Sequence, residues 1–162
     1  METEKPSRGL ALTILLATAA AGTLDITDAC VYYGITKGVP PERIFQSVAS
    51  GLLGKAAYAG GAGTAALGLF LHFSIMAVMV ATYVVASVRL PILTRRPVVM
   101  GLAYGAATYV VMNYIVLPLS QVGPRGHFVL PNFINGLLAH LILVGLTLAM
   151  IAASREKMTS TA

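Results

Sequence analysis

The chain has 162 residues, of which 57 % are apolar and only 10 % are charged, and its mean hydropathy is +0.80. A soluble domain carries about 25 % charged residues, so this chain has too little polar surface to coat a water-soluble globule. The net charge of +5 comes from basic residues at the ends of apolar runs, which is typical of membrane anchors and argues against a nucleic-acid partner. The single cysteine, Cys30, excludes an intrachain disulfide and a cysteine metal cluster.

Four apolar segments are long enough to cross a lipid bilayer as helices. Each has at least about 20 residues, the length that roughly 30 Å of hydrocarbon requires, and none alternates with the period of a barrel strand. We predict spans at about residues 9–33, 63–88, 98–120 and 133–154. The first segment also resembles a signal peptide. Its apolar stretch continues past the small residues Ala19 to Ala21, so we expect it to be retained as a span.

The first loop is too long for a simple connection and contains a candidate amphipathic helix at about residues 41–58. Ile44, Val48 and Leu52 recur at i, i+4 and i+8, whereas polar residues such as Ser50 fall on another side. This helix is too short and too polar to span, so we predict that it lies in the outer membrane interface. We favour a lid packed on the end of the bundle over a gate above a cavity.

Lys and Arg residues are shared unevenly between the two sides of the predicted membrane. The N-terminal segment, the second loop and the C-terminal tail hold seven of the eleven, and the other two loops hold four. The positive-inside rule therefore predicts that both termini lie in the cytoplasm.

The sequence looks like two copies of a helical hairpin. Residues 68–72 (GLFLH) and 136–140 (GLLAH) match as G-L-x-x-H, and an arginine follows each histidine further along its helix. Because each copy starts and ends on the same side, the copies are predicted to be related by a two-fold axis along the membrane normal. The predicted fold is an all-α membrane protein with a single domain, residues 1–162: a bundle of four transmembrane helices from two parallel helical-hairpin repeats, with one amphipathic interfacial helix between spans 1 and 2.

Polar residues of all four spans lie at a matched distance from the cytoplasmic arginines. They are Asp25, His72, Asn113 and His140, and Asp28 follows one turn further out on the same face as Asp25. Ionisable groups inside a membrane are costly and normally face the bundle interior. We therefore predict a buried polar layer in the outer third of the bilayer, with Asp25 within reach of His72.

Three functions remain open for this layer. Histidine beside a carboxylate can relay protons or bind small ions in a small transporter or channel. His72 and His140 can instead hold haem b or, with an aspartate, a divalent metal, although no cofactor is expected. The layer can also be purely structural, joining helices by hydrogen bonds in an assembly subunit. The sequence lacks HExxH and GxSxG motifs, so an enzyme is the less favoured class.

Gly101 and Gly105 have the GxxxG spacing that permits close approach of membrane helices. The sequence leaves open whether they face another span or a second copy of the chain. One four-span chain is a thin bundle, so for a transporter we expect a homodimer with these two glycines at its contact. The other expected partner is the lipid bilayer.

Several of these features resemble one family. They are Gly136 and His140 near the start of the fourth span, His72 in the second, and the Leu117-Pro118-Leu119 segment that closes the third. The loop that begins RIFQSVASGLLGKAAYAGG is similar to that of hypothetical integral membrane proteins of proteobacteria. On these residues the chain resembles the YagU-type family of small uncharacterised bacterial inner-membrane proteins. The resemblance covers most of the chain and implies four spans in a bacterial inner membrane. It implies no activity.

Overall fold

Helices form every regular element among residues 5–123 and 128–160, the part of the chain that the computed structural model describes. The 3₁₀-helix is η1, and η2 and η3 are π-helices. In chain order the elements are α1 (Lys5–Lys37), α2 (Pro41–Leu53), η1 (Gly54–Ala59), α3 (Gly61–Arg89), α4 (Ile92–Arg95), α5 (Pro97–Val111), η2 (Met112–Val116), α6 (Leu117–Leu119), α7 (Leu130–Leu138), η3 (Ala139–Leu146) and α8 (Thr147–Ser160).

Four helical spans are long and apolar enough to cross a membrane, which confirms the prediction. They are Gly9–Lys37, Gly61–Arg89, Pro97–Leu119 and Leu130–Arg155. The third consists of α5, η2 and α6 in succession, and the fourth of α7, η3 and most of α8. In lipid, backbone N–H and C=O groups must be bonded within their own segment, which is why such apolar runs are helical throughout. The chain has the features of a multi-pass membrane protein.

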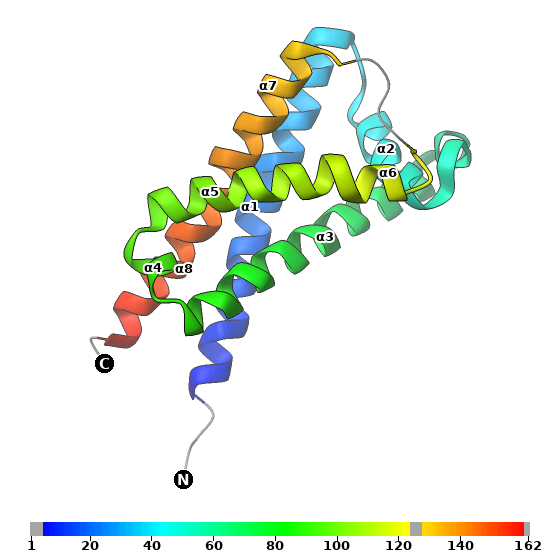
Figure 1. Ribbon diagram of the computed structural model, residues 1–162. Coiled ribbons are helices and arrows are strands. Elements are labelled where there is room, and N and C mark those ends of the chain that lie inside the picture. The colour runs from blue at the N-terminus through cyan, green and yellow to red at the C-terminus, as the bar shows by residue number, and fades with distance from the viewer. Residues whose placement is uncertain (1–4, 124–127, 161–162) are drawn as a thin grey trace.

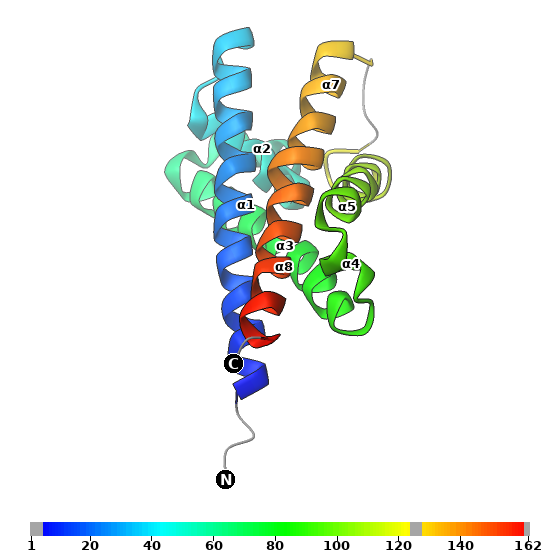
Figure 2. The same cartoon turned by 90° about the vertical axis from the view of Figure 1, so that its left-hand side faces the viewer.

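The spans cross one another rather than standing as four parallel rods. The first span, α1, lies beside the fourth and runs in the opposite direction, so that α1 begins at the end of the molecule where α8 ends (Figure 1). The helices α3 and α5 run obliquely across this pair, and the turned view shows α5 almost end-on (Figure 2). Contacts join α1 to α3 and α5 to η3, so span 1 packs on span 2 and span 3 packs on span 4. The two-fold relation between two hairpin repeats stays a prediction.

Side chains from spans 1, 2 and 4 form the centre of the packing. The buried cluster consists of Ala17, Ala21, Met76, Val80, Tyr83, Val84, Val144, Leu148, Ala149 and Ala152. Its alanines let helix backbones approach closely, which is how helices associate in lipid. The hydroxyl of Tyr83 donates to the carbonyl oxygen of Leu93 at 2.8 Å, so this buried side chain is satisfied at its polar end.

Glycines hold α5 and η3 backbone against backbone. A methyl group at Gly101 would lie 2.7 Å from the carbonyl oxygen of Gly145, and one at Gly105 would overlap the carbonyl oxygen of His140. Both glycines of the GxxxG pair are buried in this contact within one chain. They are therefore not available to a second copy, and the prediction that they form the contact of a homodimer is wrong. Whether the chain forms a dimer through another surface stays a prediction.

The helix predicted at about residues 41–58 is α2 followed by the 3₁₀-helix η1. It packs across α3, and a methyl group at Gly68 would overlap the carbonyl oxygen of Phe45. The predicted apolar stripe is only partly buried: Ile44 is buried but Leu52 is 59 % exposed, while Ser50 is buried. Close backbone packing favours small residues at the contact, and the Ser50 hydroxyl donates to a carbonyl of its own helix. The position of α2 at a membrane interface stays a prediction.

Candidate functional site

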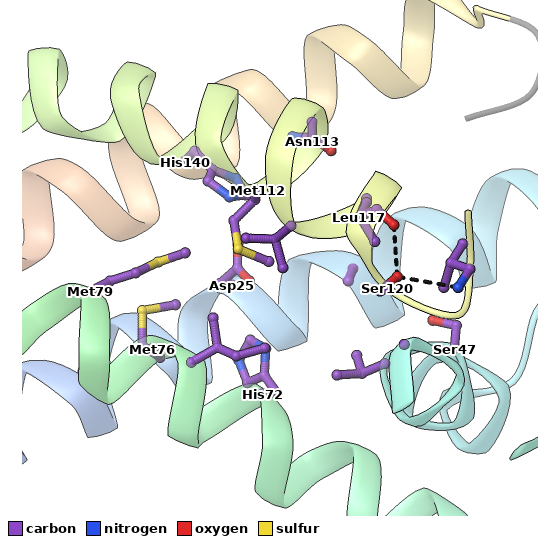
Figure 3. A pocket seen from close by; sticks show the side chains of 16 residues that line it. Asp25, Ser47, His72, Met76, Met79, Met112, Asn113, Leu117, Ser120 and His140 are labelled. Carbon is purple, nitrogen blue, oxygen red and sulfur yellow. Dashed lines mark hydrogen bonds between the residues drawn. The ribbon is translucent and has the colours of Figure 1, made fainter. Parts of the chain in front are cut away.

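One cavity of about 350 Å³ brings together residues from every span. It lies between α1, α2, α3, η2, α6 and η3 (Figure 3). Four of the five residues proposed for the polar layer line it: Asp25, His72, Asn113 and His140. Far apart in the sequence, they face a common space because α3 and the third span cross the antiparallel pair of spans 1 and 4.

His72 is fixed by the backbone of the first span. Its Nε2 lies 2.9 Å from the carbonyl oxygen of Gly22. A carbonyl oxygen only accepts hydrogen bonds, so Nε2 carries the proton and, in the neutral ring, Nδ1 keeps its lone pair. Gly22 permits this approach because a methyl group there would lie 2.6 Å from the ring of Phe73. The sequence analysis did not identify Gly22 as the partner of His72.

His140 has the opposite tautomer. Its Nδ1 lies 3.0 Å from the carbonyl oxygen of Gly136 on the preceding helical turn, so Nδ1 donates and Nε2 keeps the lone pair. The ring of Tyr109 stands edge-on to the imidazole at a centroid distance of 5.4 Å and limits how it can turn. In each histidine one ring nitrogen therefore donates a hydrogen bond to a backbone carbonyl, and the other has a lone pair that can accept a proton or bind an ion.

Asp25 lies between the two histidines in the cavity (Figure 3). The described residues make no hydrogen bond to its carboxyl group, and the side chains of both histidines line the same cavity. A half-buried carboxylate without hydrogen bonds is costly in a membrane unless it is protonated, wetted or paired with a cation. The cavity provides the space for water or for such a cation.

Asn113 lies in the π-helix η2, and its side chain is only 6 % exposed. Its Nδ2 donates to the carbonyl oxygen of Tyr109 at 2.8 Å. The wide turn has a local cause, because Pro118 lacks an N–H and its ring would clash with the carbonyl four residues earlier in a regular α-helix. The N–H of Leu117 accordingly bonds to Met112, five residues back.

Both π-helices of the described chain carry a residue of the cavity lining, Asn113 in η2 and His140 in η3. π-Helical turns are rare in proteins, but those that occur are often found at functional sites. The wider turn changes the direction in which the side chains point, and here it accompanies the opening between spans 3 and 4.

Asp28 is the proposed residue that does not line this cavity. Its Oδ2 accepts a hydrogen bond of 2.8 Å from Nδ2 of Asn135 on α7, and both residues border a smaller pocket of about 260 Å³. Three residues along an α-helix turn the side chain by about 300°, which leaves it some 60° away from Asp25. On α1 this rotation is enough to direct Asp28 toward α7 instead of the cavity.

The sequence analysis missed three methionines that line the cavity, Met76, Met79 and Met112. A signal for two of them exists, since His72, Met76 and Met79 follow one another at i, i+4 and i+7 on one face of α3. The sequence does not distinguish them, because methionine in an apolar helix usually packs in the hydrophobic core. The hydroxyls of Ser47 and Ser120 also line the space.

Among residues 5–123 and 128–160, no group of three or more His, Cys, Asp or Glu side chains is arranged to hold a metal ion. Comparisons of the chain with protein-family models, with curated proteins and with solved structures found no match. The functional interpretation therefore rests on the geometry of the cavity.

Proposed function

We propose that the protein is a small transporter or channel of a bacterial inner membrane and that it handles protons or small cations in the cavity around Asp25. The observation that carries the proposal is the position of this carboxyl group. It lies between two histidines, without a hydrogen bond from the described residues, in a space that four spans enclose.

The two histidines suit proton transfer because each has one free ring nitrogen. With Nε2 of His72 and Nδ1 of His140 donating to carbonyls, the free atoms are Nδ1 of His72 and Nε2 of His140. An imidazole ring can accept a proton on its free nitrogen and release one from the other, which is what a proton relay requires. A proton can then pass from one histidine to the other by way of Asp25, with water completing the steps that exceed hydrogen-bond distance.

The other interpretations of the polar layer are less well supported. A haem held by both histidines would have to lie between their rings, and Figure 3 shows the charged side chain of Asp25 between them in this view. A purely structural role accounts for the Asp28–Asn135 bond and for the bond from His72 to Gly22, but it leaves the unbonded carboxyl group of Asp25 unexplained.

The test is ion flux into liposomes that contain the purified protein. We expect a membrane potential to drive proton or cation uptake, and Asp25→Asn to reduce it by about tenfold or more, because the amide holds no charge and does not relay protons. His72→Asn and His140→Asn should act in the same direction while leaving the fold intact, since an amide can still donate to the carbonyls. Asp28→Asn is the matched control outside the cavity and should retain uptake.

Two results would count against this function. One is wild-type uptake no greater than that of empty liposomes. The other is undiminished uptake by Asp25→Asn and both histidine variants, which would leave these residues a structural role.

The orientation we propose places both termini in the cytoplasm and α2 on the periplasmic side. A phosphatase reporter that is active only in the periplasm should be active when fused after Lys37 and silent when fused after Thr94. Lys37 ends the first span and Thr94 follows the second, so the orientation we propose puts them on opposite sides of the membrane. The reverse pattern would turn the cavity toward the cytoplasm. Membership of the YagU-type family is likewise part of the proposal.

A further inference from the structure

We propose that the cation of this cavity is a soft monovalent metal ion, Cu(I), held by the thioethers of Met76, Met79 and Met112 beside Asp25. This inference rests on the proposed function and specifies the class of ion. It starts from side chains that the proton relay does not use.

Three of the chain's seven methionines line this one cavity. Met76 and Met79 come from α3, and Met112 comes from η2 on the other side of the space. The sulfur atoms of all three point toward the region of Asp25, whereas Ser47 and Ser120 lie at the other end of the cavity (Figure 3). Met76 is only 4 % exposed, so its sulfur atom faces the protein interior and not lipid.

Packing explains part of this cluster, because Met76 belongs to the buried core and Met79 packs against it. Methionine commonly fills irregular gaps in a core because its side chain is long and flexible. Here the three side chains border one part of a cavity of about 350 Å³ that they leave unfilled. Leucine or phenylalanine at the same positions would bury as much apolar surface, so the thioether itself is the distinguishing feature.

The chemistry of the lining selects a soft cation. Thioether sulfur is a weak hydrogen-bond acceptor and a poor partner for hard ions, but it is a preferred ligand of Cu(I). The carboxylate of Asp25 would neutralise one positive charge, which removes most of the cost of placing the ion within the membrane.

Other cations fit the lining less well. A quaternary ammonium ion is usually held by aromatic faces, and the described lining contains no Phe, Tyr or Trp. For a hard cation such as Na⁺, the oxygen atoms are divided, with Asp25 near the sulfurs and Ser47 and Ser120 at the far end.

The experiment measures Ag(I) binding to the full-length protein in detergent by titration calorimetry in chloride-free buffer. Silver is the probe because it is soft and monovalent like Cu(I) and does not change oxidation state on handling. We expect about one Ag(I) per chain, and a triple variant, Met76→Leu, Met79→Leu and Met112→Leu, should bind at least about tenfold more weakly. Leucine conserves the volume of methionine, so the fold should persist.

The matched control replaces two methionines outside the cavity lining, Met100→Leu and Met150→Leu, and should bind Ag(I) like the wild type. X-ray absorption of the wild-type silver complex adds a readout that needs no variant, and it should show sulfur atoms bound to the metal. Undiminished binding by the triple variant, or a shell of oxygen and nitrogen alone, would overturn the proposal. A third contrary result would be no binding of Ag(I) together with binding of tetraphenylphosphonium, a bulky organic cation, that does not depend on the methionines.

The two proposals fail in different ways. Asp25-dependent proton uptake without Ag(I) binding would refute the copper site and leave the proposed function standing. Methionine-dependent Ag(I) binding without any ion uptake would refute transport, and the site would then bind copper without moving it.

Discussion

The two halves of the third span behave in opposite ways. In α5, Gly101 and Gly105 bring the backbone against η3 so closely that no side-chain carbon fits between them. In η2, Met112 and Asn113 border an open cavity. The first half of the third span therefore packs directly on the fourth span, whereas its second half borders the cavity.

His140 belongs to both regions. Its carbonyl oxygen is the atom that a methyl group at Gly105 would overlap, and its ring lines the cavity. The closed half thus fixes the backbone from which this histidine reaches toward Asp25. The open site therefore depends on the tight contact beside it, because a polar side chain in a membrane is held in place only as firmly as its backbone.

The strongest way to break this arrangement is Gly105→Ala. The added methyl group meets backbone atoms, which cannot turn aside as a side chain can, so we expect a loss of about 1–3 kcal/mol or more in the free energy of unfolding. Thermal or SDS-induced unfolding in detergent measures it. Gly63→Ala on α3 is the control, because nothing lies within 4 Å of the added carbon there. Equal stability of the two variants would mean that α5 and η3 are not in backbone contact.

A smaller effect separates the two aspartates. Asp28→Ala removes the hydrogen bond from Asn135 that joins α1 to α7, and should lower stability by about 0.6–2 kcal/mol without reducing ion uptake. Asp25→Asn should leave stability unchanged, because no hydrogen bond from the described residues is lost, and should reduce ion uptake. Unfolding and liposome uptake, measured on the same two preparations, give the answer. A loss of uptake in Asp28→Ala would make both aspartates part of one site.

The smallest expected effect concerns the link between the closed half and the cavity wall. The hydroxyl of Tyr104, which lies on α5 between the two glycines, donates to the carbonyl oxygen of Met79 at 2.7 Å. Tyr104→Phe should cost about 0.6 kcal/mol, the average for such bonds in membrane proteins. Tyr114→Phe, at a side chain that is 61 % exposed, is the control and should be neutral in the same unfolding assay. A neutral Tyr104→Phe would show that the two regions are not joined through this bond.

Spacing along the sequence was enough to select four residues that border the same cavity, because residues at equal depth on packed spans have a common neighbourhood. The same reasoning failed for Asp28, since a rotation of about 60° from Asp25 directs a side chain to a different neighbour. It also passed over Met112, because a methionine in an apolar helix looks the same whether it fills a core or lines a space. The roles of Asp25, His72, Asn113 and His140 in ion handling stay a prediction.

The sequence by itself determined that there are four spans and roughly where they lie, although the first continues to Lys37 and the fourth begins at Leu130. That is a local matter: an apolar segment in lipid must satisfy its backbone within itself, so composition and length suffice. Only the tertiary structure decided which faces meet. The crossing of α3 and α5 over the other spans, the glycine contact that encloses Gly105, and the π-helical turns of η2 and η3 depend on side chains brought together from distant segments. The cavity exists because those contacts close one half of the third span and leave the other half open.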